Sequence, residues 1–236
     1  VEQNSKLVGY NEAKSWWFKR NSAHQPPTAQ RDIAIQNYDA HYLGDVSSKV
    51  IYLTFDEGYE NGCSSKILDI LKANNVKAAF FVTKSYIDSE PELVKRMAEE
   101  GHIVGNHSTT HPDMTTLSDA QIKQEIEGCA NAYKNLTGKD MPKFFRPPAG
   151  GYSIRTLEKT KELGYKTIFW SFAYKDWVTT EQPGAEAAYQ NVMTNYHNGS
   201  IMLLHAVSES NTQALDRIIK SLKEQGYTFK SLEELP

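Results

Sequence analysis

Short apolar runs alternate with longer amphipathic stretches along most of the chain. The run Val50–Phe55 is rich in β-branched and aromatic residues and has the length of a buried strand. In the stretch that follows it, Ile67, Leu68 and Leu71 recur at helical spacing and share one face. The same succession of strand and helix continues to the C-terminus at roughly 30 residues per unit.

The periodicity predicts about seven strands separated by helices. Ser118 with Gln121, and Ser89 with Glu92, have the spacing of capping boxes at helix starts. This alternation favours an α/β fold with a mostly parallel sheet, either an open doubly wound sheet or a barrel. The predicted strands are 50–55, 76–82, 102–105, 144–145, 165–170, 201–204 and 227–229, and the predicted helices are 64–74, 91–101, 118–137, 153–163, 184–197 and 211–226.

The first 47 residues lack this periodicity. They contain Trp16-Trp17-Phe18 and a Pro26-Pro27 turn. We therefore expect residues 1–47 to form an N-terminal extension packed on a main domain of residues 48–236. Its aromatic residues would serve as packing anchors, with sugar stacking by Trp16 or Trp17 as the alternative.

Composition excludes several classes of function. The net charge is −3, so the chain lacks the charge balance of a nucleic-acid-binding protein, and no apolar run approaches the roughly 18 residues of a membrane span. Cys63 and Cys129 have no metal-binding or redox spacing, and we interpret them as packing residues.

The chain begins at Val1, which fits a removed signal peptide or a trimmed chain. We expect a monomer.

Polar residues with catalytic chemistry follow most of the predicted strands. The carboxyl ends of parallel strands meet at one edge, so these side chains should converge there. Taken alone, adjacent carboxylates after one strand could also be a solvated acidic turn. The residues concerned are Asp56, Glu57, His107, Arg146, Asp176 and His205.

A histidine pair indicates a metal. His107 and His111 have the H-x-x-x-H spacing that can place two imidazoles on one divalent ion, with a carboxylate as third ligand. Pro112 disfavours helical geometry at His111, so we expect a tight turn. Arg146 is followed by two prolines, which favour either a rigid guanidinium clamp for a carboxylate or an ordinary rigid loop.

Five motifs in sequence order resemble those of the polysaccharide deacetylases, carbohydrate esterase family 4, whose shared part is the NodB homology domain. The resemblance covers about residues 48–232. GYENG after the first motif, AHQPP at residues 23–27 and the ending GYTFKSLEEL most resemble the sporulation subgroup, the peptidoglycan N-acetylmuramic acid deacetylases. The five motifs are TFDEG (54–58), HSTTH (107–111), RPPAG (146–150), DW (176–177) and LLH (203–205).

The resemblance implies an irregular (β/α) barrel with a surface groove and a metal-dependent de-N-acetylation. Asp56 would be the general base, tethered by Arg146. His205 would be the general acid, oriented by Asp176. The remaining implied roles are metal binding by Glu57, His107 and His111, an oxyanion contact at Ala149, enclosure of the acetyl group by Trp177 and Leu203, and a further substrate contact at Tyr152.

Three residues depart from the family pattern. Glu57 stands where Asp is usual, Ala149 where an aromatic residue is frequent, and Ala173 where an acidic residue is usual. The expected cofactor is one divalent ion, with Zn²⁺ favoured by the imidazoles. The small residue at Ala149 favours a bulky sugar such as N-acetylmuramic acid, whose 3-O-lactyl group carries a carboxylate. Arg155 or Lys175 could pair with that carboxylate, or both could be ordinary surface charges.

The expected function is therefore deacetylation of N-acetylmuramic acid in peptidoglycan glycan strands, in the pathway to muramic δ-lactam of the spore cortex. The expected location is secreted or on the cell-wall side of the membrane. The alternatives are a general N-acetylglucosamine or chitin deacetylase, a glycosidase using Asp56 and Glu57, and a non-catalytic glycan-binding module. The glycosidase is disfavoured because adjacent residues rarely face each other across a substrate at the roughly 5–10 Å required.

Overall fold

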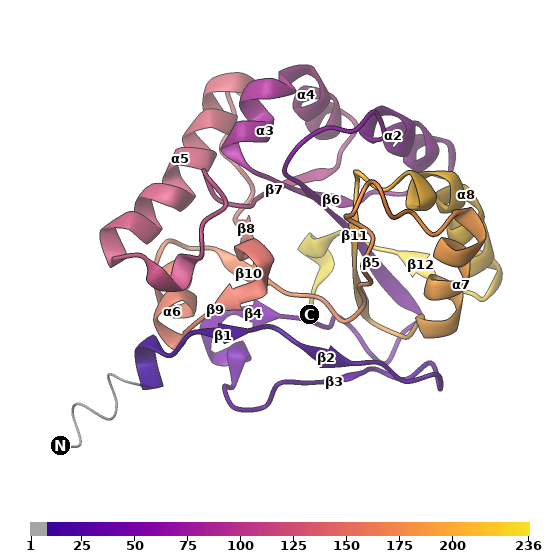
Figure 1. Cartoon of the computed structure of the whole chain (residues 1–236), viewed down its shortest axis with the longest axis horizontal. Coiled ribbons are helices and arrows are strands. Elements are labelled where there is room, and N and C mark those ends of the chain that lie inside the picture. Colours follow the sequence, from indigo (N-terminus) through magenta and orange to yellow (C-terminus); the bar gives the residue numbers. More distant parts are fainter. Residues whose placement is uncertain (1–8) are drawn as a thin grey trace.

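One curled parallel sheet organises the molecule (Figure 1). The computed structural model describes residues 9–236. The sheet has eight strands in the order β11-β5-β6-β7-β8-β10-β4, with β12 also paired to β5, and every pairing is parallel. The strands are β4 (Ala40–His41), β5 (Val50–Glu57), β6 (Ala79–Val82), β7 (Ile103–Asn106), β8 (Phe144–Phe145), β10 (Lys166–Ile168), β11 (Ser200–His205) and β12 (Thr228–Phe229).

The sheet curls so that its two sides, β11 on one and β10 and β4 on the other, approach each other and are joined by isolated bridges. A parallel bridge joins Phe172, beyond the end of β10, to Met202 of β11, and an antiparallel bridge joins Leu43 to Ser200. The predicted irregular (β/α) barrel is confirmed and the open sheet is excluded. All seven predicted strands are present, and β4 is an eighth that comes from the predicted extension.

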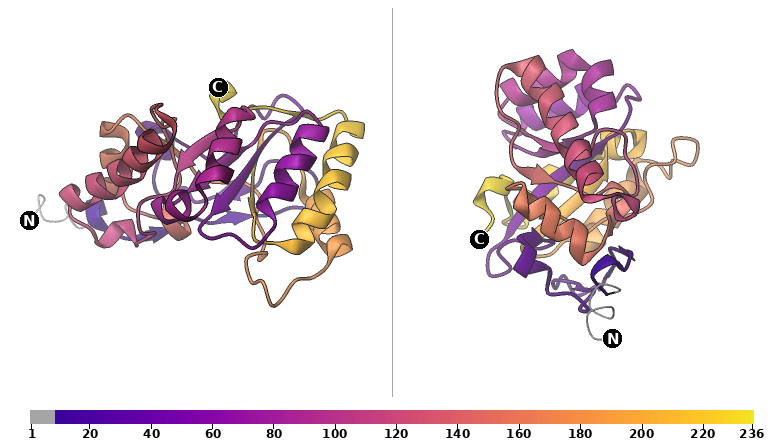
Figure 2. Two further views of the ribbon diagram at one scale, coloured as in Figure 1. Left: turned by 90° about the horizontal axis from the view of Figure 1, so that it is seen from above. Right: turned by 90° about the vertical axis from the view of Figure 1, so that its left-hand side faces the viewer.

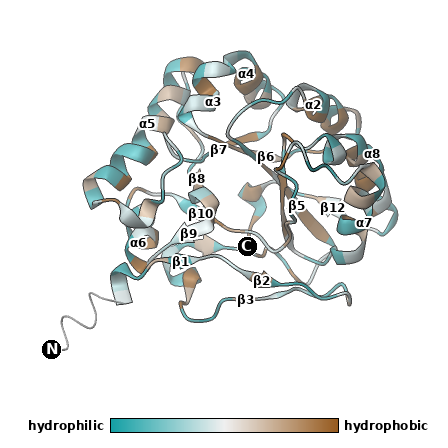
Figure 3. Ribbon diagram, in the orientation of Figure 1, coloured by the Kyte–Doolittle hydropathy of each residue, from teal (hydrophilic) through white to brown (hydrophobic). Residues whose placement is uncertain are grey.

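Helices surround the outside of this sheet (Figure 1). The apolar faces predicted from periodicity point to the core: Ile67, Leu68 and Leu71 of α2 are fully buried. Brown, hydrophobic colouring follows β5 through the centre of the molecule (Figure 3). The helices are α2 (Ser64–Ala73), α3 (Lys84–Ser89), α4 (Pro91–Glu99), α5 (Asp119–Thr137), α6 (Ile154–Glu162), α7 (Ala185–Asn195) and α8 (Glu209–Glu224).

The capping predictions had different outcomes. The box of Ser118 and Gln121 is present at the start of α5. The box of Ser89 and Glu92 was wrong, because Ser89 is the last residue of the short helix α3. Glu90 begins α4 without a side-chain capping bond.

The N-terminal extension is held against the barrel by short strands, although its first eight residues lie outside the described part. β1 (Lys14–Ser15) pairs antiparallel with β9 (Gly151–Tyr152), and β2 (Phe18–Lys19) pairs with β3 (Thr28–Ala29). Figure 1 shows β1, β2 and β3 along the lower side of the molecule, and Figure 2 shows an orange segment near residue 180 that projects from it.

Two expectations from composition can be compared with the structure. Cys63 and Cys129 are both free and fully buried, as expected of packing residues. Within residues 9–236, no helix has the length and apolar character to cross a bilayer.

Candidate active site

A cavity of about 750 Å³ opens at the carboxyl ends of the strands. Asp56 lies near the end of β5 and His205 ends β11, and the parallel register places these two residues directly opposite each other. His107 follows β7, and it too lines the cavity. Most of the predicted site residues therefore meet in one place. Those that line the cavity are Asp56, His107, His111, Ala149, Trp177, Leu203 and His205.

Asp56 is held by a buried arginine. Nη1 of Arg146 donates to Oδ1 of Asp56 at 3.0 Å and to the Thr54 hydroxyl at 2.8 Å. The other guanidinium nitrogens donate to the backbone carbonyls of Ile168 and Phe169, and the Arg146 side chain is fully buried. The guanidinium is thus fixed at every nitrogen.

The charge of Arg146 sets the ionisation of Asp56. Burial by itself raises the pKa of this carboxyl, but Arg146, with smaller contributions from His107 and His205, outweighs burial and lowers the pKa below its usual 3.8. Asp56 is therefore a carboxylate at neutral pH and can accept a proton.

The two histidines of the HSTTH motif lie face to edge. Their ring centroids are 4.9 Å apart. Nδ1 of His107 lies 2.7 Å from the Arg146 carbonyl oxygen, so it carries the proton and leaves the Nε2 lone pair available. Burial, with a smaller effect of His111, lowers the pKa of His107 to about 4, so the 3.7 Å contact between its Nε2 and Asp56 is not an ion pair at neutral pH.

The backbone turns sharply at this motif. His111 has φ of 58° and Ser108 has φ of 74°, so the segment forms the predicted tight turn and not a helix. The Ser108 hydroxyl accepts a hydrogen bond from the His111 N–H at 2.9 Å. Strained backbone of this kind persists where surrounding contacts hold it, often at functional sites.

His205 is oriented by a buried carboxylate. Nδ1 of His205 donates to Oδ1 of Asp176 at 2.7 Å, and the His205 backbone N–H donates to Oδ2 at 2.9 Å. Asn211 donates to the same Oδ2, and Tyr174 donates to Asn211 in turn. This network leaves Nε2 of His205 directed away from Asp176.

The pKa of His205 moves in the opposite direction to that of Asp56. Burial alone lowers the pKa of His205, but the hydrogen bond and the charge of Asp176 outweigh burial, so the pKa lies above its usual 6.5. The cavity therefore pairs a carboxylate that can accept a proton with an imidazole whose protonated form is stabilised.

Glu57 does not line the cavity. Its side chain is fully buried and Oε1 accepts a hydrogen bond from the Ser64 hydroxyl at 3.0 Å, while Oε2 has no hydrogen-bond partner among the described residues. Burial, together with the nearby charges of Glu60 and Asp56, raises the pKa of Glu57 well above its usual 4.5. The structure therefore places this carboxyl away from the two imidazoles.

The residues around His107 and His111 supply only part of the ligand set that a divalent ion requires. Nε2 of His107 is free of hydrogen bonds to the Arg146 carbonyl and lies 3.7 Å from the Asp56 carboxylate, and the His111 ring is 4.9 Å from the His107 ring. Within residues 9–236, no group of three histidine, cysteine, aspartate or glutamate side chains has the geometry of a preformed metal site. An ion held here would rely on the two imidazoles and on ligands from outside the chain.

The RPPAG loop is supported by the N-terminal extension. The Trp16 N–H donates to the Gly150 carbonyl, and Trp16 Nε1 donates to the Trp170 carbonyl, both at 2.9 Å. The Trp16 ring stacks on Phe169 at 4.5 Å. A Cβ at Gly150 would lie 2.8 Å from the Trp170 ring, so this position requires glycine. Ala149, with φ of 52°, is thereby presented to the cavity.

Trp16 is therefore a packing anchor, as expected. It is 7% exposed and does not line the active-site cavity, and neither does the exposed Trp17. Tyr152 lies elsewhere than expected for a substrate contact, because it is fully buried against Trp16 and Phe169.

Three aromatic rings that the sequence did not single out, those of Tyr59, Trp170 and Tyr174, line the cavity together with the predicted Trp177. Tyr59 and Trp177 are each about half exposed, whereas Tyr174 is buried. Trp177 contacts the His205 ring edge to face at 5.4 Å. Tyr59 belongs to the GYENG sequence and directly follows the TFDEG motif. An aromatic residue next to a catalytic motif was the sequence signal that could have identified it as a lining residue.

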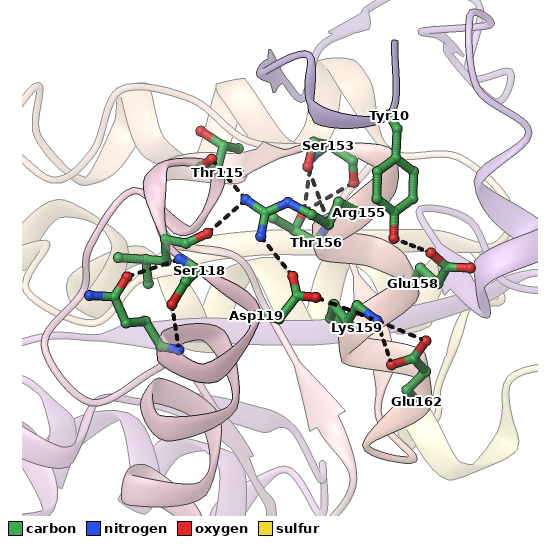
Figure 4. A network of polar contacts seen from close by, with 12 residues as sticks. Tyr10, Thr115, Ser118, Asp119, Ser153, Arg155, Thr156, Glu158, Lys159 and Glu162 are labelled. Atoms are coloured by element: carbon green, nitrogen blue, oxygen red, sulfur yellow. Dashed lines mark hydrogen bonds and ion pairs between the residues drawn. The ribbon is translucent and has the colours of Figure 1, made fainter. Parts of the chain in front are cut away.

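Of the two candidate cations, only Lys175 reaches the cavity. Lys175 lines it and pairs with Glu181 at 2.9 Å. Arg155 is engaged elsewhere: it pairs with Asp119 at 2.9 Å and donates to the Leu117 carbonyl, joining α6 to the start of α5 (Figure 4).

Comparison with known proteins gives one consistent family. Residues 43–168 match the family model described as polysaccharide deacetylase. The chain is 48% identical to the peptidoglycan-N-acetylmuramic acid deacetylase PdaA of Bacillus subtilis (strain 168), over 95% of this chain and 86% of that protein. The structure of Bacillus subtilis PdaA, a family 4 carbohydrate esterase, matches with a TM-score of 0.93, covering 95% of this chain and 97% of that one.

A more distant relative has a different substrate in its name. The chitooligosaccharide deacetylase of Bradyrhizobium sp. (strain ANU 289) is 32% identical over 81% of this chain and 93% of that protein.

Proposed function

This chain belongs to the polysaccharide deacetylase family, and from that membership we propose that it removes the acetyl group from N-acetylmuramic acid residues of peptidoglycan glycan strands. The observation that carries the proposal is the pairing of Asp56 with Arg146 and of His205 with Asp176 on two neighbouring strands of one cavity. The product is a free amine on the sugar and acetate, with the glycan chain intact.

The two pairs have complementary roles in amide hydrolysis. Asp56, ionised beside Arg146, takes a proton from the water that attacks the acetyl carbonyl carbon. His205, whose protonated form Asp176 stabilises, gives its Nε2 proton to the amide nitrogen as the C–N bond breaks. Arg146 and Asp176 hold these two groups in position, and Ala149 would present backbone to the oxyanion.

Deacetylases of this family depend on a metal in general. His107 and His111 would hold the ion, for which we favour Zn²⁺. When bound, it supplies Lewis-acid activation of water and of the acetyl carbonyl. Glu57 is not included among the proposed ligands, because its carboxyl is buried against Ser64.

The preference for N-acetylmuramic acid rests on two observations. Identity to the muramic acid deacetylase is 48%, against 32% for the chitooligosaccharide deacetylase. Ala149 also lines the cavity, and its small side chain leaves more room for the 3-O-lactyl group than an aromatic residue would. The proposal places the protein outside the cytoplasmic membrane, where peptidoglycan lies.

The test compares acetate release from glycan strands without peptide stems and from chitohexaose at matched concentration. Faster release from the muramic strands supports the proposal. Equal or faster release from chitohexaose would make the protein a general N-acetylglucosamine deacetylase. Shortened glycan chains would indicate a glycosidase, and binding without any acetate would indicate a non-catalytic module.

A further inference from the structure

A second, smaller cavity adjoins the active site on the side of the N-terminal extension. Its volume is about 240 Å³. His111 and Ala149 line both cavities, so the two adjoin at these residues. A polymer bound with one unit at Asp56 and His205 can therefore continue over His111 and Ala149 into the smaller cavity.

The extension supplies one wall of this cavity. Ala13, Lys14 and Ser15 line it. The wall is fixed, because β1 pairs antiparallel with β9 and places Ser15 opposite Gly151. The next residue of the extension, Trp16, is buried and hydrogen-bonded to the RPPAG loop.

Other lining residues carry groups that bind hydroxyls. Asp113 and Thr115 line the cavity, and Oδ1 of Asp113 accepts hydrogen bonds from the Thr115 N–H and hydroxyl at 3.0 and 2.6 Å. The carboxylate and hydroxyl oxygens of these two residues, with the Ser15 hydroxyl, suit the polar edge of a sugar. The active-site cavity differs, because Tyr59, Trp170 and Trp177 give it aromatic walls.

Gly151 keeps this cavity open. It has no side chain, and a Cβ built there would lie 3.5 Å from Asp113 and 3.7 Å from the Pro148 carbonyl, which are ordinary contacts. Its φ of −75° is one that any residue adopts. A larger side chain at position 151 would therefore fill the cavity without straining the backbone.

We infer that the smaller cavity binds the saccharide unit next to the one being deacetylated, so that the N-terminal extension forms part of the glycan-binding groove. The inference rests on the proposed function, because a neighbouring unit exists only when the substrate is a polymer. It makes chain length a determinant of activity, since a substrate too short to reach Ser15 loses the contacts made there.

The test fills the cavity and compares substrates of two lengths. Ser15→Trp blocks it from the extension side, and Lys19→Trp, at an exposed position of β2 that lines neither cavity, is the matched control. The measurement is kcat/KM for acetate release from long stem-free glycan strands and from the monosaccharide N-acetylmuramic acid, which has no neighbouring unit. We expect Ser15→Trp to lower the ratio of long-strand to monosaccharide kcat/KM about tenfold, equivalent to about 1.4 kcal/mol, while Lys19→Trp keeps the wild-type ratio.

A second pair of variants covers the possibility that Ser15→Trp does not fold. Gly151→Phe fills the cavity from the barrel side and should lower the ratio similarly, whereas Gly151→Ala should change it less. An unchanged ratio in folded Ser15→Trp and Gly151→Phe would overturn the inference while leaving the proposed function intact. Absence of acetate release by the wild-type protein from every strand would instead count against the proposed function.

Discussion

Asp56 and Glu57 are neighbours in the chain, yet they lie in two different regions of the molecule. Asp56 lines the cavity beside Arg146, and Glu57 is buried behind the strand beside Ser64. The pKa of Asp56 is lowered because the adjacent guanidinium outweighs burial, and the pKa of Glu57 is raised because burial and two nearby carboxylates act together. Chemical similarity between two side chains thus says little about their ionisation, which depends on the partner that each face of the strand provides.

The largest expected effect comes from removing the charge on the cavity side. Asp56→Asn should lower turnover by about 10²–10⁴, the scale of lost acid–base catalysis, because the amide cannot accept a proton from water. Steady-state acetate release measures the loss, and a thermal unfolding curve verifies folding. Glu57→Gln is the matched control and should retain turnover near the wild-type value. Turnover within tenfold of wild type in Asp56→Asn would contradict the assigned base.

The affinity for metal should also differ between variants in the cavity and variants at the buried Glu57. His111→Ala should weaken binding of Zn²⁺ by about 10–100-fold, the range known even for residues that merely support metal ligands. Glu57→Gln should leave the affinity unchanged, because the Glu57 side chain is hydrogen-bonded to Ser64. Titration calorimetry with Zn²⁺ on metal-stripped protein measures both. A loss of affinity in Glu57→Gln equal to that in His111→Ala would return Glu57 to the set of ligands.

The proton donor gives a pH-dependent test. Asp176→Asn should lower turnover about tenfold at the optimum, within the scale of general acid catalysis. It should also move the alkaline limb of the kcat profile to lower pH. The sign follows from the pKa of His205, which Asp176 raises: the protonated donor persists above the usual 6.5 in wild type and is lost earlier without the carboxylate. An unmoved alkaline limb would show that another group sets it.

The smallest expected effect is on the free energy of unfolding, through the buried Glu57. The pKa of Glu57 is raised in the folded protein, so its favourable contribution is complete below 4.5 and is lost as pH rises through the folded-state value. Glu57→Gln should therefore gain stability relative to wild type as pH increases from 4.5, by at most about 1.4 kcal/mol per pH unit for one proton. Urea unfolding across this range measures the difference, and a difference independent of pH would contradict a raised pKa.

The sequence predicted the fold well because its signals are local. Buried faces such as that of Ile67, Leu68 and Leu71 follow from helical spacing, and strand lengths follow from short apolar runs. The edge strand β4 was missed because two residues, Ala40 and His41, carry no periodicity, and their pairing with β10 depends on residues far along the chain.

The site was predicted only as far as strand ends determine it. Motif order brought Asp56, Arg146 and His205 to one edge of the sheet, where the structure has them. The placement of Glu57 was missed for a specific reason: the predicted strand ended at Phe55, whereas β5 continues to Glu57. Successive side chains of a strand point to opposite faces, so extending the strand by two residues separates the two carboxylates.

Tyr152 was missed for the same kind of reason. It was expected as a substrate contact, but it belongs to β9, which pairs with β1 of the extension. That pairing places Tyr152 under Trp16, and the partner strand lies far from it in sequence. Such contacts cannot be deduced from local spacing.

The bond between Trp16 and Trp170 spans 154 positions in the chain. During synthesis the residues around Trp16 are made long before their partners in β9 and beyond the end of β10. Contacts of such long sequence separation form late, because closing a large loop costs conformational entropy before the contacts can stabilise the chain. The extension therefore docks late in assembly, and the RPPAG loop acquires its final support only after the chain as far as Trp170 is in place.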